Sequence, residues 1–156
     1  MKRYLERVCR DAIVSRCRRT GKEQCSIELH NFAGLILDCD HVSTPPGKKK
    51  CDFLAFAFSS DRDVAIAAIE MKKGGNIDIT GAVQQLQAGA DMAADLLARD
   101  QASARCCFHR ILVHNGVAKP IMLKKLRRMQ VKFSGRNLRI ARQRCGEAWD
   151  HASAPH

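Results

Sequence analysis

Aromatic side chains are scarce in this sequence of 156 residues, which holds one Trp, one Tyr and six Phe. Proteins dedicated to reading single-stranded nucleic acid stack successive bases on aromatic side chains. Most of the few aromatic residues here stand among apolar neighbours, where a core needs them. The sequence therefore argues against a dedicated reader of single strands or of base sequence.

Long apolar runs are also missing. No stretch approaches the roughly 20 apolar residues that a membrane-spanning helix requires. The basic start MKRYLERVCR is not followed by the apolar segment of a signal peptide. We therefore expect a cytoplasmic protein with no membrane contact. Its length and apolar fraction indicate a single domain over residues 1–150, followed by a tail at 151–156.

The C-x-x-C spacing that zinc ribbons and fingers use is absent as well. A core of this size does not need covalent staples, and several cysteines fall at apolar positions of predicted helices and strands. We expect reduced, buried thiols, with disulfides as the alternative. The eight cysteines are Cys9, Cys17, Cys25, Cys39, Cys51, Cys106, Cys107 and Cys145.

Acidic residues are absent from residues 101–146, although the net charge of the whole chain is already +11. A segment of one sign suits a polyanion, because a merely soluble surface usually intersperses acids. We therefore expect nucleic acid as the partner of this basic C-terminal third, which begins near residue 105. A soluble basic surface and an acidic protein partner are the alternatives. The basic residues of the segment are Arg105, Arg110, Lys119, Lys124, Lys125, Arg127, Arg128, Lys132, Arg136, Arg139, Arg142 and Arg144.

The chemistry of the chain centres on residues 50–72, KCDFLAFAFSSDRDVAIAAIEMK. Two apolar runs rich in strand-forming residues flank a turn-forming segment at 59–63, which predicts a hairpin. If the hairpin folds symmetrically about Asp61, the opposed pairs are Phe58 with Val64, Phe56 with Ile66, and Leu54 with Ala68.

The same register places Asp52 opposite Glu70, at the end of the apolar ladder. Two opposed carboxylates repel each other, and burial raises the pKa of at least one of them. A divalent cation removes that conflict, because Mg²⁺ accepts one or two carboxylates together with waters and a substrate phosphate. Lys72 shares a face with Glu70 and is placed to orient a water or to steady a developing phosphoryl charge. The pattern therefore predicts a Mg²⁺ site.

Asp52 at the start of one strand and Glu70-Met71-Lys72 at the end of the next resemble the motif of the PD-(D/E)XK nuclease superfamily, the restriction-endonuclease-like fold. The resemblance covers about residues 30–115 and departs from the motif at Cys51, where the motif has Pro. It implies an α/β fold with a mixed central sheet, in the order helix, antiparallel three-stranded meander, helix, strand. It also implies that Asp52, Glu70 and the carbonyl of Met71 hold Mg²⁺ or Mn²⁺.

The helix expected after this motif, capped by Asp78 or Thr80 and extending to about Arg99, contains several glutamines. The resemblance implies that Gln85 reaches the active site, whereas helical spacing alone places Gln87 nearest the apolar stripe. We adopt Gln85, because the site lies at one end of the sheet and not under its centre.

Further acidic and histidine side chains are weaker candidates. The resemblance implies that Glu6 can complete the metal site, but a helical ion pair with Arg10 explains it as well. Asp38, Asp40 and His41 follow a predicted strand, and either approach the metal or form a solvated loop. We interpret His109 and His114 as structural, because Lys72 makes a histidine base unnecessary.

Elsewhere the apolar spacing predicts a helix over residues 3–19, strands over 25–30, 35–37 and 105–114, a basic helix over 121–129 and a hairpin across a turn at 134–137. The residues expected to contact nucleic acid are Lys48, Lys49, Lys50, Lys73, Lys124, Lys125, Arg127 and Arg128. Together with the resemblance, they imply a Mg²⁺-dependent endonuclease acting on DNA more than on RNA, in defence or repair, as a homodimer or with a protein partner. The alternative is a catalytically silent nucleic-acid-binding adaptor of the same fold.

Overall fold

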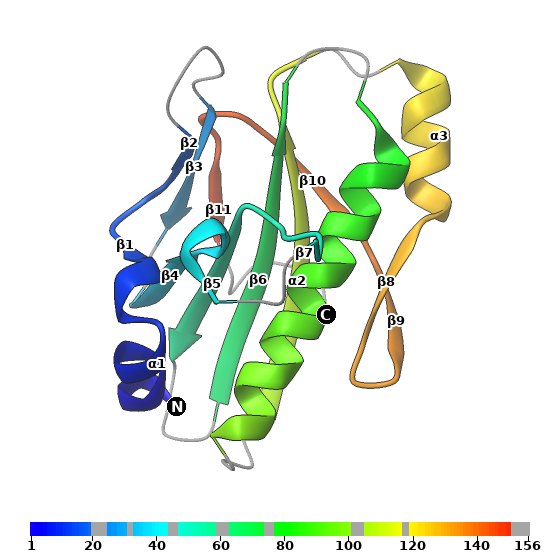
Figure 1. The fold of residues 1–156 in the computed structure, drawn as a ribbon. Helices are drawn as coiled ribbons and strands as arrows, with labels where there is room; N and C mark the ends of the chain where they lie inside the picture. The colour runs from blue at the N-terminus through cyan, green and yellow to red at the C-terminus, as the bar shows by residue number, and fades with distance from the viewer. Residues whose placement is uncertain are drawn as a thin grey trace.

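A mixed sheet forms the centre of the computed structural model, which describes residues 1–19, 25–30, 33–43, 47–58, 63–73, 77–100, 105–116 and 119–150 (Figure 1). The sheet has six strands in the order β1–β4–β5–β6–β7–β10. Pairing is antiparallel from β1 to β6 and parallel from β6 to β10. The strands are β1 (Ile13–Val14), β4 (Gly34–Asp38), β5 (Phe53–Phe58), β6 (Asp63–Lys72), β7 (Arg105–His114) and β10 (Ala141–Arg144). The predicted α/β class, mixed sheet and antiparallel meander are confirmed.

Helix α2 (Ile79–Arg99) covers one face of this sheet (Figure 1). Of the two predicted caps, Asp78 starts the helix, because its carboxylate accepts a hydrogen bond of 3.0 Å from the Gly81 amide. Leu86, Ala90 and Ala93 lie on the buried stripe of α2, against Leu54 and Phe56 of β5. The helix ends at Arg99, as the sequence predicts.

A small sheet covers the opposite face, so the central sheet is buried on both sides. It has three strands in the order β11–β3–β2, namely β11 (Ala148–Asp150), β3 (Cys25–His30) and β2 (Cys17–Arg19). Ile27 of β3 packs with Phe53, Ile69 and Val113 of the central sheet. Burial on both faces explains why β5 and β6 are continuous apolar runs and do not alternate with polar residues.

The single helix predicted over residues 3–19 is wrong. Helix α1 covers only Lys2–Val8, a 3₁₀ turn covers Arg10–Ala12, and the chain then forms β1 and β2. Ile13 and Val14 are β-branched and pair with Leu37 and Ile36 of β4. Tertiary pairing thus overrides a spacing of apolar residues that also suits a helix.

The expectation of reduced thiols is wrong for two of the cysteines. Cys25 and Cys145 form a disulfide between residues 120 positions apart in the sequence. Parallel pairing of β11 with β3 brings the segment that precedes β11 beside β3, and the Cα atoms of Cys25 and Cys145 lie 5.2 Å apart. The other six cysteines are free thiols, of which Cys9, Cys17, Cys39 and Cys51 are buried as expected.

The basic C-terminal third folds around α2 and β7. Helix α3 (Pro120–Arg128) buries Leu126, and the hairpin of β8 (Gln130–Phe133) and β9 (Arg136–Arg139) packs Val131 and Phe133 into the core. The predicted hairpin is confirmed with a shorter turn, Ser134-Gly135, in which both residues have positive φ angles of 46° and 79°. Strands β10 and β11 were not predicted; the residues of β10 are mostly exposed and show no apolar alternation.

Candidate active site

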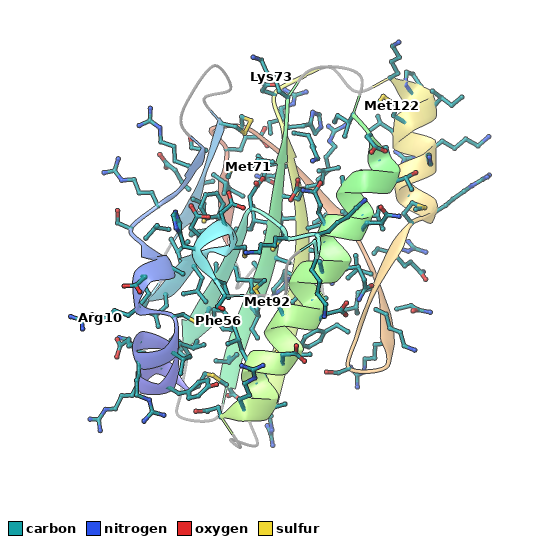
Figure 2. All side chains as sticks on the ribbon, in the orientation of Figure 1. Arg10, Phe56, Met71, Lys73, Met92 and Met122 are labelled. Carbon is teal, nitrogen blue, oxygen red and sulfur yellow. A yellow bond between two sulfur atoms is a disulfide. The ribbon has the colours of Figure 1, made fainter. Side chains whose placement is uncertain are left out.

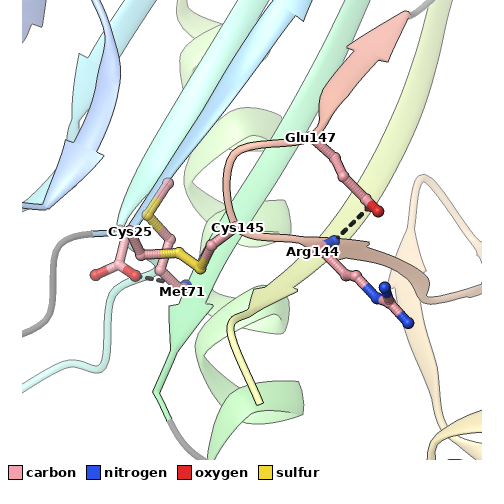
Figure 3. Close-up of a disulfide and its surroundings, with 6 residues drawn as sticks. Cys25, Met71, Arg144, Cys145 and Glu147 are labelled. Atoms are coloured by element: carbon pink, nitrogen blue, oxygen red, sulfur yellow. Dashed lines mark hydrogen bonds between the residues drawn. A yellow bond between two sulfur atoms is a disulfide. The ribbon is translucent and has the colours of Figure 1, made fainter. Parts of the chain in front are cut away.

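The β5–β6 register brings Asp52 beside Glu70. The pairs Phe58 with Val64, Phe56 with Ile66, and Leu54 with Ala68 are all observed, so the predicted register is confirmed. The centre of the predicted turn, residues 59–62, lies outside the described part of the chain. Asp52 directly precedes β5, and its amide donates to the Ile69 carbonyl at 3.0 Å. Its carboxylate Oδ2 accepts from the Met71 amide at 2.6 Å, which fixes it against the end of β6 (Figure 3).

Glu70 is the most deeply buried charged residue of this group, with 1% of its surface exposed. Its Oε1 lies 2.7 Å from Lys72 Nζ, whereas its Oε2 is buried without a hydrogen-bond partner among the described residues. Burial raises the pKa of Glu70 to about 7, the Asp52 carboxylate adds to this, and Lys72 opposes it. The predicted conflict between two carboxylates is therefore present at Glu70.

Gln85 of α2 holds Lys72 in place. Lys72 Nζ donates to Gln85 Oε1 at 2.6 Å, and Gln85 Nε2 donates to the Lys50 carbonyl at 3.2 Å. Gln87 lies elsewhere, where it exchanges two hydrogen bonds with the Lys132 backbone and ties β8 to α2. The choice of Gln85 over Gln87 thus agrees with the geometry, because Gln85 contacts the lysine of the motif.

The donors available for a metal are the carboxylates of Asp52 and Glu70 and the carbonyl of Met71. Among the described residues, no group of three or more His, Cys, Asp or Glu side chains gathers to hold a metal ion. Mg²⁺ does not need such a cage, since it binds through one or two carboxylates and keeps several waters. The unpartnered, buried Oε2 of Glu70 is an oxygen that a cation would satisfy. The donor set therefore fits Mg²⁺ or Mn²⁺.

Of the weaker acidic candidates, Asp38 lies next to this group, because it pairs with Phe53 and the following Cys39 amide donates to the Asp52 carbonyl at 3.0 Å. Glu6 is exposed on α1, which ends at Val8, so a helical pair with Arg10 does not form either. In Figure 2, Arg10, just after α1, lies at the lower left of the molecule, whereas Lys73, the residue after β6, lies at the top. Asp38 accepts from the Asp40 amide at 3.0 Å and so caps the 3₁₀ turn at Cys39–His41.

The two β7 histidines differ in their surroundings. His109 is buried, and its Nε2 lies 3.3 Å from Cys107 Sγ. His114 is also buried, but neither of its ring nitrogens has a hydrogen-bond partner among the described residues. A structural role for His109 is therefore supported by a hydrogen-bond partner of its ring. For His114 no such partner is found among the described residues.

The predicted nucleic-acid contacts fall on two surfaces. Near the site, Lys49 bonds to Gln84, while Lys50 Nζ donates to the carbonyls of Val42 at 2.9 Å and Asp40 at 3.3 Å. Lys48 and Lys73 are exposed in the same region. On α3, the exposed side is formed by Lys124, Lys125, Arg127 and Arg128.

Sequence reasoning missed Arg142 and Arg144 as candidate site residues. Both belong to β10, which pairs with β7 so that Arg144 is the partner of His114. Figure 3 shows Arg144 in the segment that leads to the Cys25–Cys145 disulfide, with its amide donating to Glu147 Oε2 at 2.8 Å. The lack of acids over residues 101–146 was the only sequence signal for them.

No protein-family model matches the chain, and no match was found among the curated proteins or the solved structures compared with it. Among the described residues, no helix combines the length and the apolar character needed to cross a membrane. What can be said of function therefore rests on the geometry of the site.

Proposed function

We propose that this chain is a metal-dependent phosphodiesterase of the restriction-endonuclease-like class that cuts nucleic acid, with DNA as the first substrate to test. The observation that carries the proposal is the state of Glu70. Its carboxylate is buried beside Asp52, bonded to Lys72 through one oxygen and unpartnered at the other. Burying such a group costs stability, and a functional site is the usual place where that cost is tolerated.

The order of the elements supports the proposal. Helix α1 precedes the antiparallel meander β4–β5–β6, helix α2 follows, and β7 pairs in parallel with β6. This is the order that the resemblance implies. Asp52, Glu70 and Lys72 also lie at the positions that the resemblance implies, at the start of β5 and at the end of β6.

Each residue of the site has a definable task. Asp52, Glu70 and the Met71 carbonyl would hold Mg²⁺ or Mn²⁺. The bound cation supplies Lewis-acid stabilisation of the phosphate and lowers the pKa of a nearby water. Lys72 presents an ammonium group beside Glu70 and is placed to donate to the attacking water or to a phosphate oxygen. Gln85 positions Lys72 through the 2.6 Å hydrogen bond.

The substrate class follows from charge. The exposed side of α3 presents Lys124, Lys125, Arg127 and Arg128 without a single acid from residue 101 to 146. Contacts of this kind bind the phosphate backbone and lose affinity steeply with salt. We therefore expect binding that depends little on base sequence.

The test is cleavage of plasmid DNA, single-stranded DNA and RNA by the purified chain with Mg²⁺ or Mn²⁺, and with EDTA. Glu70→Gln and Lys72→Met should lower the rate on the order of 10²–10³-fold, because each removes a group that acts in the transition state. Glu6→Gln is the matched control, since Glu6 is exposed and lies outside the site. It should cut at the wild-type rate.

Two other outcomes would contradict the proposal. Salt-sensitive DNA binding without cleavage under any metal would identify the catalytically silent adaptor. Equal cleavage by wild type, Glu70→Gln and Lys72→Met would show that a contaminant or a different site cuts.

A further inference from the structure

A pocket of about 490 Å³ opens between β7, β10 and α3, outside the carboxylate site. Its lining includes His114 of β7, Leu123 of α3, and Arg142 and Arg144 of β10. The strand pairing links this pocket to the proposed active site. Lys72 of β6 pairs with His114 of β7, and His114 pairs with Arg144 of β10.

The three paired residues form one row across neighbouring parallel strands. Paired residues in such strands project from the same face. Lys72 contacts Gln85 of α2, so the row lies on the helix-covered face of the sheet. Neighbouring strands are about 4.8 Å apart, which places the Arg144 end of the row roughly 10 Å from Lys72.

His114 is the unusual member of this row. Only 2% of its surface is exposed, and both ring nitrogens lack a hydrogen-bond partner among the described residues. Leaving a buried polar group unpaired costs stability. Its backbone is satisfied, since the His114 carbonyl accepts from the Cys145 amide at 3.1 Å. The orphaned ring thus points to a missing ligand at the base of the pocket.

The charges around His114 define the chemistry of that ligand. Arg142 and Arg144 are exposed, and neither guanidinium has a partner among the described residues. Burial lowers the pKa of His114 and both arginines lower it further, whereas the nearby Gly116 backbone and the Glu147 carboxylate raise it. Glu147, whose carboxylate bonds to the Arg144 backbone amide, is the acid that faces this group. Two unpaired guanidinium groups beside a buried imidazole favour a phosphate, which takes two parallel hydrogen bonds from each arginine.

We propose that this pocket binds a backbone phosphate of the nucleic-acid strand, a few nucleotides from the bond that is cut. The substrate class rests on the proposed function. Arg142 and Arg144 donate to the phosphate oxygens, and His114 donates through one ring nitrogen. The reach of roughly 10 Å exceeds the 3.4 Å axial rise between successive phosphates of one strand, so the bound phosphate is separated from the cut bond by at least one linkage. By holding this phosphate, the subsite would direct the nucleic-acid strand across β6, β7 and β10.

Binding is measured apart from cleavage, with the Glu70→Gln protein in EDTA. The readout is the fluorescence anisotropy of a 5′-fluorescein DNA of roughly 20 nucleotides, which spans several Debye lengths at physiological salt. Arg142→Ala/Arg144→Ala should weaken binding at least about 10-fold and lower the slope of log K against log salt by about 1–2. The matched control is Arg136→Ala/Arg139→Ala on exposed β9, which removes the same charge outside the pocket. It should change binding less than about 3-fold. Equal losses in the two pairs would overturn the subsite.

A second measurement locates the phosphate. One linkage at a time is replaced by a neutral methylphosphonate along the shortest DNA that the protein still binds, so that only one binding register is available. A single linkage should weaken binding to the Glu70→Gln protein, and the same linkage should have no effect on the Arg142→Ala/Arg144→Ala protein. A flat profile would overturn the proposal. His114→Gln is tested only after its circular dichroism matches the parent, because a buried substitution can unfold the chain.

The outcomes separate the subsite from the nuclease. Cleavage by wild type with no difference between the arginine pairs removes the subsite alone. Selective loss of binding in Arg142→Ala/Arg144→Ala, in a chain that never cuts, leaves the subsite standing and removes the nuclease. Inorganic phosphate is the last probe. Tight binding of phosphate alone, with DNA binding unchanged in the arginine variant, would assign the pocket to a free phosphate and overturn the strand assignment.

Discussion

Glu70 and Lys72 form a 2.7 Å salt bridge from two positions on the same face of β6, one buried and the other partly exposed. The bridge uses only one carboxylate oxygen, and the other stays buried without a partner. Lys72 therefore compensates only part of the cost of burying Glu70, which is why the pKa of Glu70 remains at about 7. This imbalance leads to a prediction about stability.

Without metal, the stability of the chain should fall as the pH rises through 7. The pKa of Glu70 is raised from 4.5 in the unfolded chain to about 7 in the fold, so the folded state binds the extra proton in between. The stabilisation is complete below about pH 4.5 and lost as pH rises through the folded pKa. Relative to Glu70→Gln, the wild type should lose on the order of 3 kcal/mol between pH 5 and 8.5. Urea unfolding of both proteins in EDTA measures this, and a difference independent of pH would contradict it.

Substitutions of Gln85 and Gln87 should have different effects, the first on the cleavage rate through Lys72 and the second on the stability of the fold. Gln85→Ala should lower the cleavage rate on the order of 10-fold, because Lys72 loses its 2.6 Å partner. Gln85→Glu keeps an acceptor for Lys72 and should recover most of the rate. Gln87→Ala should cut normally but lose about 1 kcal/mol of stability, because it releases the Lys132 backbone. If Gln87→Ala lost activity and Gln85→Ala did not, Gln87 and not Gln85 would be the residue that positions Lys72.

Gly89 should not tolerate a methyl group, although Ala is the better helix former. A Cβ there would lie 2.6 Å from Cys51 Sγ and 3.0 Å from the Ala68 Cβ. Both neighbours are buried in the core beside the site, so Gly89→Ala should cost about 1–3 kcal/mol through overpacking. Adding Cys51→Ala removes the sulfur and should recover part of the loss. Unfolding curves of the single and double variants measure the effect; an unchanged or raised stability of Gly89→Ala would show that α2 is not held at this distance.

The Cys25–Cys145 disulfide should stabilise the chain strongly because its loop is long. The two residues are 120 positions apart, and closing such a loop in the unfolded chain corresponds to about 5 kcal/mol in the chain-entropy model. Reductant should therefore lower the free energy of unfolding by about 2–5 kcal/mol. Cys25→Ala/Cys145→Ala is the control and should not respond to reductant. An equal response in both proteins would point to other thiols.

The local sequence pattern was sufficient to predict the strands and the helix in the middle of the chain. Strands β5 and β6 are apolar and separated by turn-forming residues, so their register followed from the two-residue period of a strand. That register alone placed Asp52 beside Glu70. The start and end of α2 followed from its apolar stripe and from the carboxylate of Asp78.

Only the tertiary structure decided the parts that depend on distant partners. The spacing of Ile13 and Cys17 suits a helix as well as a strand. Pairing of β1 with β4 and of β2 with β3 makes both segments strands. Helical spacing alone favoured Gln87 over Gln85, and only the position of α2 over β6 shows that Gln85 is the glutamine that contacts Lys72.

The C-terminal strands show the same limit most clearly. Residues of β10 are mostly exposed and polar, so no apolar period marks them as a strand. They form a strand because they pair with the edge of β7. The disulfide and the pocket at His114 depend on that same placement. The sequence by itself therefore determined the two carboxylates and their lysine, because their relation is local to one hairpin. The tertiary structure decided which basic residues stand beside them, because those residues lie about 70 positions further along the chain and reach the site only through sheet order.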